Sequence, residues 1–172
     1  MWGYKNNISH DNIIEKNHIH HIGQGKLSDM GGIYLLGMQH GTVVSGNVVH
    51  DVISSNYGGM GIYTDEGSSY ITVEDNIVYR CKECCYQHHY GKHNTIRNNV
   101  FAFAGRALID ISRREDRSSI LVEENTLISD GELDDAQDAV RLACEAGVDA
   151  IIVQDLGLAD IIHRCAPDMP LH

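Results

Sequence analysis

The chain has 172 residues, of which 42% are hydrophobic, and its 24 acidic and 13 basic residues give a formal net charge of −11. This apolar fraction excludes a wholly disordered chain, and the acidic balance argues against a nucleic acid or an anionic membrane surface as the main partner. No apolar run is long enough to cross a bilayer, and the N-terminal region lacks the basic flank and apolar stretch of a secretion signal.

Residue usage changes near residue 128. All 11 Asn, all 8 Tyr and 14 of the 17 Gly precede this point. The first part holds 14 acidic and 11 basic residues, whereas the remainder holds 10 and 2. Such different usage predicts two domains, residues 1–128 and residues 129–172.

The first part is built from a repeat. Each unit has a β-branched run, an asparagine and a second apolar run, as in IIEKN-HIHHI, VVSGN-VVHDV, ITVEDN-IVYRC, TIRNN-VFAF and ILVEEN-TLI. A third run follows in most units: GGIYLLG, GMGIYTDEG, CCYQHHYG and ALIDIS. Three short strands per repeat predict an all-β parallel β-helix of about four to five coils.

The repeated asparagines are predicted to be structural. They are Asn17, Asn47, Asn76, Asn99 and Asn125. Asparagine tolerates the left-handed backbone conformation of a sharp corner, and amides stacked about 4.8 Å apart can hydrogen-bond in a ladder. We expect both properties to be used here.

The second part has a different pattern. Apolar residues recur at helical spacing over 133–146, and an apolar run typical of a buried parallel strand follows over 148–153. A second helix is predicted over 158–164, before Pro167. These elements indicate a short α/β segment of helix, strand and helix.

The strings LSDMGGIYLLG, GGMGIYTDEGSSYITVEDNIVYR and QHHYGKHNTIRNNVFAF resemble right-handed parallel β-helix enzymes of the pectate-lyase-like superfamily. The resemblance covers about residues 7–128 and is greatest to bacterial β-helix glycoside hydrolases. It implies a polysaccharide or oligosaccharide substrate on one long face, and members include fucosidases and xylanases acting on plant polysaccharides. It also implies a secreted or periplasmic parent protein.

The string AGVDAIIVQDLGLADIIHRCAPDMPLH resembles the N-terminal region of the peptidase U32 family. The resemblance covers about residues 127–172 and implies a piece of a larger, TIM-like α/β architecture that is mostly cytoplasmic. The two implied locations disagree, so localisation stays open. We expect this segment to carry no activity of its own. The chain is interpreted either as fragments of two genes joined near NTLI or as a genuine two-domain protein.

The third strand of each repeat predicts where polar side chains align. Aligning these strands on their tyrosine or its equivalent, about 5 Å apart, gives two adjacent columns that face opposite ways. The first contains Leu36, Asp65, His88 and Asp110, and the second contains Glu66, His89 and Ile111. Because unpaired charges are costly to bury, we expect the first column to face solvent or a cleft.

Glycosidic hydrolysis needs one carboxylic acid to protonate the leaving oxygen and a second carboxylate as base or nucleophile. Asp65, in the bend TDEGSS, is the first candidate, and Asp29 is the partner that the family-like string favours. Asp110 and Glu66 are geometric competitors, and His88 is placed to hold a proton or to orient Asp65. The predicted catalytic residues are Asp29, Asp65 and His88, and the predicted substrate-binding residues are Glu66, His89, Tyr63, Tyr90 and Asp110.

Structural alternatives exist for both carboxylates. Asp29 would then only cap the turn before Gly31 and Gly32, and Asp65 would be a solvent-exposed turn residue without a catalytic role.

No metal or cofactor is predicted. A superficially zinc-like cluster consists of Cys81, Cys84, Cys85, His88, His89 and His93. Strand alternation sends Cys84 and Cys85 to opposite faces, so we interpret the cysteines as core residues. Calcium, which would need carboxylates such as Asp29, Asp65 and Glu66, is the alternative.

The leading functional prediction is a truncated carbohydrate-active β-helix protein derived from a glycoside hydrolase, with no nucleic-acid or membrane partner and doubtful activity as this chain. A polysaccharide lyase is one alternative, with Lys92, Arg106, Arg113 and Arg114 as available bases. A non-catalytic glycan-binding or structural β-helix is the other, with sugar rings stacked on Tyr34, Tyr63, Tyr86 and Tyr90.

Overall fold

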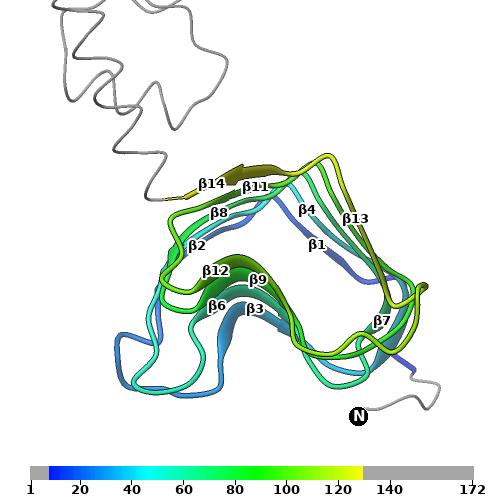
Figure 1. Cartoon of the computed structure of the whole chain (residues 1–172), viewed down its shortest axis with the longest axis horizontal. Coiled ribbons are helices and arrows are strands. Elements are labelled where there is room, and N and C mark those ends of the chain that lie inside the picture. The colour runs from blue at the N-terminus through cyan, green and yellow to red at the C-terminus, as the bar shows by residue number, and fades with distance from the viewer. Residues whose placement is uncertain (1–7, 130–172) are drawn as a thin grey trace, which may run out of the picture. The chain divides into compact units, whose positions relative to one another are not determined.

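The computed structural model describes residues 8–129, which form a parallel β-solenoid of about four turns (Figure 1). Each of the four turns contributes one strand to each of three sheets, two further strands follow at the C-terminal end, and equivalent strands of neighbouring turns pair in parallel. Residues 8–129 contain no helix, and hence none that is long and apolar enough to cross a membrane. The predicted all-β parallel β-helix is confirmed.

The three sheets are named A, B and C. Sheet A contains β1 (Ile13–Glu15), β4 (Met38–Ser45), β7 (Ser69–Glu74), β10 (Asn94–Arg97) and β13 (Ile120–Glu123). Sheet B contains β2 (His18–Ile22), β5 (Val48–Val52), β8 (Ile77–Cys81), β11 (Val100–Ala102) and β14 (Thr126–Ile128). Sheet C contains β3 (Gly31–Leu35), β6 (Met60–Thr64), β9 (Cys84–His88) and β12 (Ala107–Ile111).

The core is a set of columns inside the coil. In sheet A, Val44, Val73 and Ile96 lie in register and are fully buried. Sheet B supplies an equivalent column of Val49, Val78 and Phe101. Every second residue of a strand points inward, so these β-branched and aromatic side chains stack on their own equivalents from turn to turn.

The asparagine ladder is confirmed between sheets A and B. In the first four asparagines, Nδ2 donates to the Oδ1 of the asparagine one turn further on at 2.9 Å, and the backbone N–H donates to the same oxygen at 3.0 Å. The five rungs are the predicted residues Asn17, Asn47, Asn76, Asn99 and Asn125. The middle three are 0–1% exposed, so the ladder satisfies amides that burial would otherwise leave unpaired.

The predicted backbone role of the ladder asparagines is wrong. The left-handed conformation belongs to the residue before each of them, at φ between 51° and 63°. These residues are Lys16, Gly46, Asp75, Asn98 and Glu124. Two residues therefore form each corner. The first adopts the left-handed backbone conformation, and the asparagine that follows it points its amide inward and hydrogen-bonds to the next asparagine of the ladder.

Sheet C has a different shape from the other two sheets. Figure 1 shows that β3, β6, β9 and β12 bow toward the interior, so the outer face of sheet C is concave. Turns of varied length join sheet C to its neighbours, and they carry most of the candidate site. The predicted helices and strand over 133–164 lie outside the described residues, and the 128/129 domain boundary stays a prediction.

Replacing Asn76 by Ala tests the ladder. Its Nδ2 donates to Val44 O, Glu74 O and Asn99 Oδ1, and its Oδ1 accepts from Asn47. We expect N76A to lower the free energy of unfolding by about 3 kcal/mol, because each buried polar group left unpaired costs about 1–3 kcal/mol. Urea unfolding followed by circular dichroism measures this.

The matched control is Asn56→Ala, which removes the same side chain from an exposed loop position. It should change the free energy of unfolding by less than about 0.5 kcal/mol. Equal losses in the two variants would contradict a special role for the ladder.

Candidate functional site

The register of sheet C defines which side chains meet on its two faces. The outward column is Tyr34, Tyr63, Gln87 and Asp110, and the inward column is Leu35, Thr64, His88 and Ile111. One step further along, the backbone ladder continues from Asp65 N–H to Leu35 O at 2.9 Å and from His89 N–H to Thr64 O at 3.0 Å. Asp65 and His89 are therefore equivalent positions of neighbouring turns.

This register corrects the predicted columns by one residue at His88 and by two residues at Asp110. Asp65 was aligned with His88 and Asp110, but it is His89 that lies beside Asp65, and Asp110 is level with Gln87. The error arises at Tyr86, which pairs with Ile62 rather than with a tyrosine. The one-residue shift places His88 on the inner face, whereas the two-residue shift leaves Asp110 on the outer face.

Tyr86 faces inward for packing reasons. Its hydroxyl hydrogen-bonds the Thr64 hydroxyl at 2.8 Å, and its ring lies 6.3 Å from that of Phe101. It is fully buried, and the outward-facing Tyr63 is only 2% exposed. Neither ring can stack on a sugar, so the exposed aromatic surface comes instead from Tyr34 and from Tyr57, which the sequence did not single out.

Asp65 is the centre of the candidate site. It begins a turn that Ser68 N–H closes onto Asp65 O at 2.9 Å, with Gly67 in the left-handed region at φ 71°. The Tyr34 hydroxyl donates to Oδ2. His89 Nδ1 lies 2.7 Å from Oδ1 and must be the donor, because a carboxylate only accepts. Asp65, a residue that is only 6% exposed, therefore has both carboxylate oxygens hydrogen-bonded.

Glu66 and Tyr90 flank this carboxylate and are both half-buried. The ring of Tyr90 lies 5.0 Å from that of His89, edge to face, and Arg113 lies over the Tyr90 ring at 4.2 Å. Burial raises the pKa of Tyr90, and the charge of Glu66 adds to the shift. The predicted residues Asp65, Glu66, His89 and Tyr90 thus belong to one site.

Asp29 is exposed on the turn that precedes β3. Its backbone is left-handed, at φ 48°, and its N–H donates to Tyr57 O at 2.7 Å. Gly58 packs so closely here that a Cβ on it would lie 2.8 Å from Asp29 N, and its own φ is 105°. The turn that presents Asp29 therefore depends on a glycine in the neighbouring turn.

Electrostatics connect Asp29 to the rest of the site. Burial is the first cause that raises the pKa of Tyr34, followed by its hydrogen bond to Asp65. The negative charges of Asp65, Asp29 and Glu66 raise it further. Three carboxylates therefore act on one phenol, which stays protonated and can donate a hydrogen bond.

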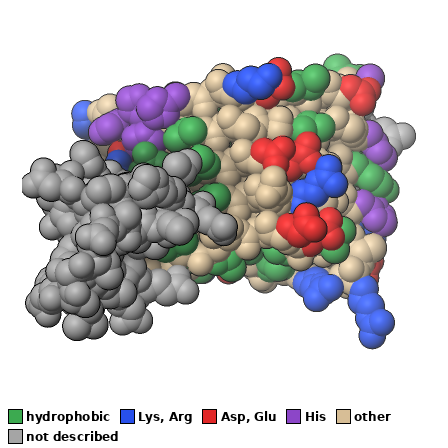
Figure 2. All heavy atoms as spheres, turned by 90° about the horizontal axis from the view of Figure 1, so that it is seen from above, with side chains coloured by type: hydrophobic (Ala, Val, Ile, Leu, Met, Phe, Trp, Pro, Cys, Tyr) green, Lys and Arg blue, Asp and Glu red, His purple; other side chains and the backbone are tan. Residues whose placement is uncertain are grey.

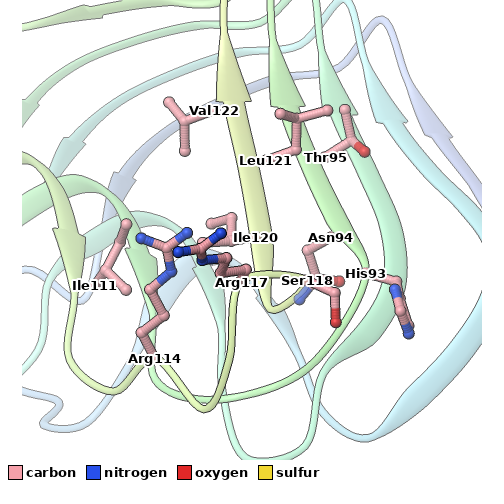
Figure 3. A pocket seen from close by; sticks show the side chains of 10 residues that line it. All are labelled: His93, Asn94, Thr95, Ile111, Arg114, Arg117, Ser118, Ile120, Leu121 and Val122. Atoms are coloured by element: carbon pink, nitrogen blue, oxygen red, sulfur yellow. The ribbon is translucent and has the colours of Figure 1, made fainter.

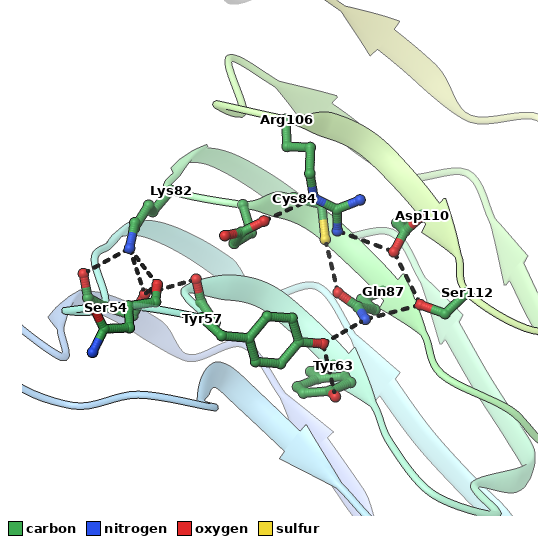
Figure 4. Close-up of polar contacts among 12 residues, drawn as sticks. Ser54, Tyr57, Tyr63, Lys82, Cys84, Gln87, Arg106, Asp110 and Ser112 are labelled. Atoms are coloured by element: carbon green, nitrogen blue, oxygen red, sulfur yellow. Dashed lines mark hydrogen bonds and ion pairs between the residues drawn. The ribbon is translucent and has the colours of Figure 1, made fainter.

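A second polar network occupies the outer face of sheet C (Figure 4). Gln87 Nε2 donates to Tyr57 OH and to Ser112 Oγ, each at 3.1 Å. Ser112 Oγ donates to Asp110 Oδ2 at 3.1 Å, and Arg106 Nη2 donates to the same oxygen at 3.0 Å. Asp110 is thus paired with a cation rather than with Asp65. Gln87 and Ser112 were not predicted, although their register positions beside Tyr63 and His89 would have indicated them.

His88 takes no part in either network. It is fully buried, and neither ring nitrogen has a hydrogen-bond partner within the described structure. Burial lowers its pKa to about 4; Glu115 opposes the shift and His89 adds to it. The predicted role of orienting Asp65 belongs to His89, because His88 points into the coil.

A cavity of about 620 Å³ lies elsewhere, between β10, β13 and the loop that follows β12 (Figure 3). Its lining includes Ile111, Ile120, Val122, Arg114 and Arg117, and no carboxylate side chain among residues 8–129 borders it. It is therefore separate from the Asp65 site.

The described residues assemble neither the zinc-like cluster of cysteines and histidines nor the carboxylates of the calcium alternative as a ligand group. No group of three or more His, Cys, Asp or Glu side chains between residues 8 and 129 is arranged to hold a metal ion, which includes Asp29, Asp65 and Glu66. Cys84 packs with Met60 and Tyr63 on the outer side, whereas Cys85 packs in the central core, as alternation predicted.

Comparison with known proteins gives a match to a family profile. The profile of peptidase family U32 matches residues 90–172, the last 83 residues of the chain. No curated protein and no solved structure matches. The match starts at Tyr90, well before the predicted start near residue 127, so it includes β10–β14 of the solenoid. The resemblance to β-helix glycoside hydrolases stays a prediction.

Replacing His88 by Leu tests its buried, neutral state. Because the folded pKa is about 4 and the unfolded value about 6.5, the unfolded chain binds more protons between these values, and the His88 contribution to stability is lost as the pH falls through this window. Between pH 7 and pH 5 the wild type should lose about 2 kcal/mol more unfolding free energy than H88L. Urea titrations at the two pH values give this difference.

His40→Leu serves as the control, since His40 is exposed. This variant should keep the pH dependence of the wild type. A wild type and H88L with the same pH dependence would show that His88 is not buried as a neutral ring.

Proposed function

We propose that the outer face of sheet C binds a carbohydrate chain and that the site hydrolyses a glycosidic bond. The observation that carries the proposal is the Asp65 carboxylate, held by the Tyr34 hydroxyl and His89 Nδ1 within reach of the charges of Asp29 and Glu66. Glycoside hydrolysis needs such a pair of carboxyl groups with unequal surroundings.

The hydrogen bonds favour one assignment of roles. Both donors bond to an ionised carboxylate, so Asp65 is suited to be the base or nucleophile rather than the acid. Asp29 and Glu66 are the two candidates for the acid. Asp110 is not, because Arg106 and Ser112 engage its carboxylate.

Aromatic rings beside Asp65 supply the binding surface. Tyr34 is 38% exposed and Tyr57 is 48% exposed. The faces of tyrosine rings can pack against the apolar faces of sugars, while their hydroxyls hydrogen-bond. Tyr90, with Arg113 over its ring, extends this surface along the stack.

Glycan binding without cleavage is the second candidate. It is favoured by the engagement of both Asp65 oxygens in hydrogen bonds and by the 6% exposure of this residue. A carboxylate held in this way can also accept hydrogen bonds from sugar hydroxyls as a purely binding group.

The family match suggests a third chemistry, the hydrolysis of peptide bonds. It rests on residues 90–172 alone, and Asp29, Asp65 and Glu66 lie outside that range. Casein is therefore included as a probe beside the polysaccharides, and Asp65→Asn should leave any casein cleavage unchanged.

The test uses the full chain with soluble plant polysaccharides, including xylan and fucosylated xyloglucan. We expect new reducing ends without the ultraviolet absorbance of an unsaturated sugar, which a lyase would produce. Asp65→Asn should lower the rate at least about 100-fold, the usual contribution of a general acid or base. Whichever of Asp29→Asn and Glu66→Gln lowers the rate comparably is the acid.

The matched control is Asp75→Asn, at an exposed corner between sheets A and B. It should keep full activity. Affinity for a polysaccharide with no cleavage by the wild type, and with affinity lost in Tyr34→Ala, would support the binding function instead. Neither cleavage nor binding of any polysaccharide would overturn both carbohydrate proposals.

A further inference from the structure

Histidine side chains gather in a patch on the surface (purple, upper left in Figure 2). Ring contacts connect four of them on the outer face of sheet B: His18, His20, His21 and His50. His20 and His50 are register partners of β2 and β5, and their rings stack at 5.2 Å. The solenoid thus brings together imidazoles that are about thirty residues apart in the sequence.

The four rings form two pairs that point nitrogen to nitrogen. His20 Nδ1 lies 2.7 Å from His21 Nδ1, and the second pair is formed by His18 and His50. His18 Nε2 lies 2.8 Å from His50 Nε2. At this distance one imidazole donates its N–H to the other, whereas if both rings carry their hydrogen on Nδ1 the two Nε2 lone pairs face one shared position that a cation can take. His18 is exposed, so the pair is open to solvent on one side, whereas His50 is 8% exposed and fixed in place.

The lone pair of His50 is oriented by a chain of charged groups. Asp51 Oδ2 lies 2.6 Å from His50 Nδ1, and Arg80 donates to both oxygens of Asp51 at 2.8 Å. Because Arg80 engages both oxygens of Asp51, this carboxylate is held to accept the Nδ1 hydrogen of His50, which leaves the Nε2 lone pair of His50 directed toward His18.

A carboxylate on the far nitrogen of a histidine is the usual support of a metal-binding imidazole, because it fixes the tautomer and raises the basicity of the ligand. Imidazole nitrogen suits zinc, copper and nickel, whereas calcium and magnesium prefer oxygen. We propose that His18 Nε2 and His50 Nε2 form a binding site for a divalent transition metal ion, supported by Asp51 and Arg80.

The remaining coordination positions face solvent and can hold water. His20 is the nearest further donor, since its ring lies 4.6 Å from that of His18. The site is on sheet B and uses none of the residues proposed for carbohydrate chemistry on sheet C. The outcome of the metal-binding test is therefore independent of the outcome of the carbohydrate test.

Isothermal titration of the full chain with Ni²⁺ and Zn²⁺, and the electron paramagnetic resonance spectrum with Cu²⁺, test the site. We expect one ion per chain and nitrogen couplings in the Cu²⁺ spectrum. His18→Gln should weaken binding at least 10-fold, and because His18 is exposed this variant should fold normally, which circular dichroism checks.

Two further variants make the test specific. Asp51→Asn keeps both ligands and should weaken binding by about 10- to 100-fold, the usual effect of losing such a carboxylate. His40→Gln removes an exposed histidine outside the patch and should leave the affinity unchanged. No metal bound by the wild type, or equal affinity in the wild type and His18→Gln, would overturn the proposal.

Discussion

The hydrogen-bonded ladder of asparagines is the interaction on which the rest of the described structure depends. At the corner between sheets A and B, each amide bonds to its equivalent in the next turn at 2.9 Å. Because the side-chain period of a strand is two residues, any slip here would turn the whole core outward. The ladder therefore fixes the register of sheets A and B, and it does so independently of the number of residues in sheet C and its connections.

Sheet C lies away from the ladder, and its connections vary. The segments that lead into it from sheet B are residues 23–30, 53–59, 82–83 and 103–106. Because these segments differ in length, the number of residues after each ladder asparagine does not fix the register of the strands in sheet C. Its alignment is decided by packing, such as the inward turn of Tyr86 against Thr64 and Phe101. The Asp65 site lies on the part of the coil whose register is least determined locally.

Both proposed sites use the same property of a solenoid. Residues a full turn apart come within one strand spacing, so a pair of polar residues from neighbouring turns can meet with little additional ordering. His89 reaches Asp65 in this way on sheet C, and His50 reaches His18 on sheet B. In each pair one partner is buried and held by further hydrogen bonds, and the other faces solvent. Such a pair combines a fixed group with one that a ligand can reach.

The sequence by itself determined the three-strand repeat, the five ladder asparagines and the grouping of Asp65 with Glu66, because these depend on residues close together in the chain. It could not determine which histidine meets Asp65, since His88 and His89 differ by one position and only packing across turns decides which faces inward. The roles of Tyr34 and Gln87, and the convergence of His18 on His50, were likewise decided by tertiary structure. The physical reason is that parallel stacking makes neighbours of residues separated by a whole coil, and the register of that stacking is a property of the folded core.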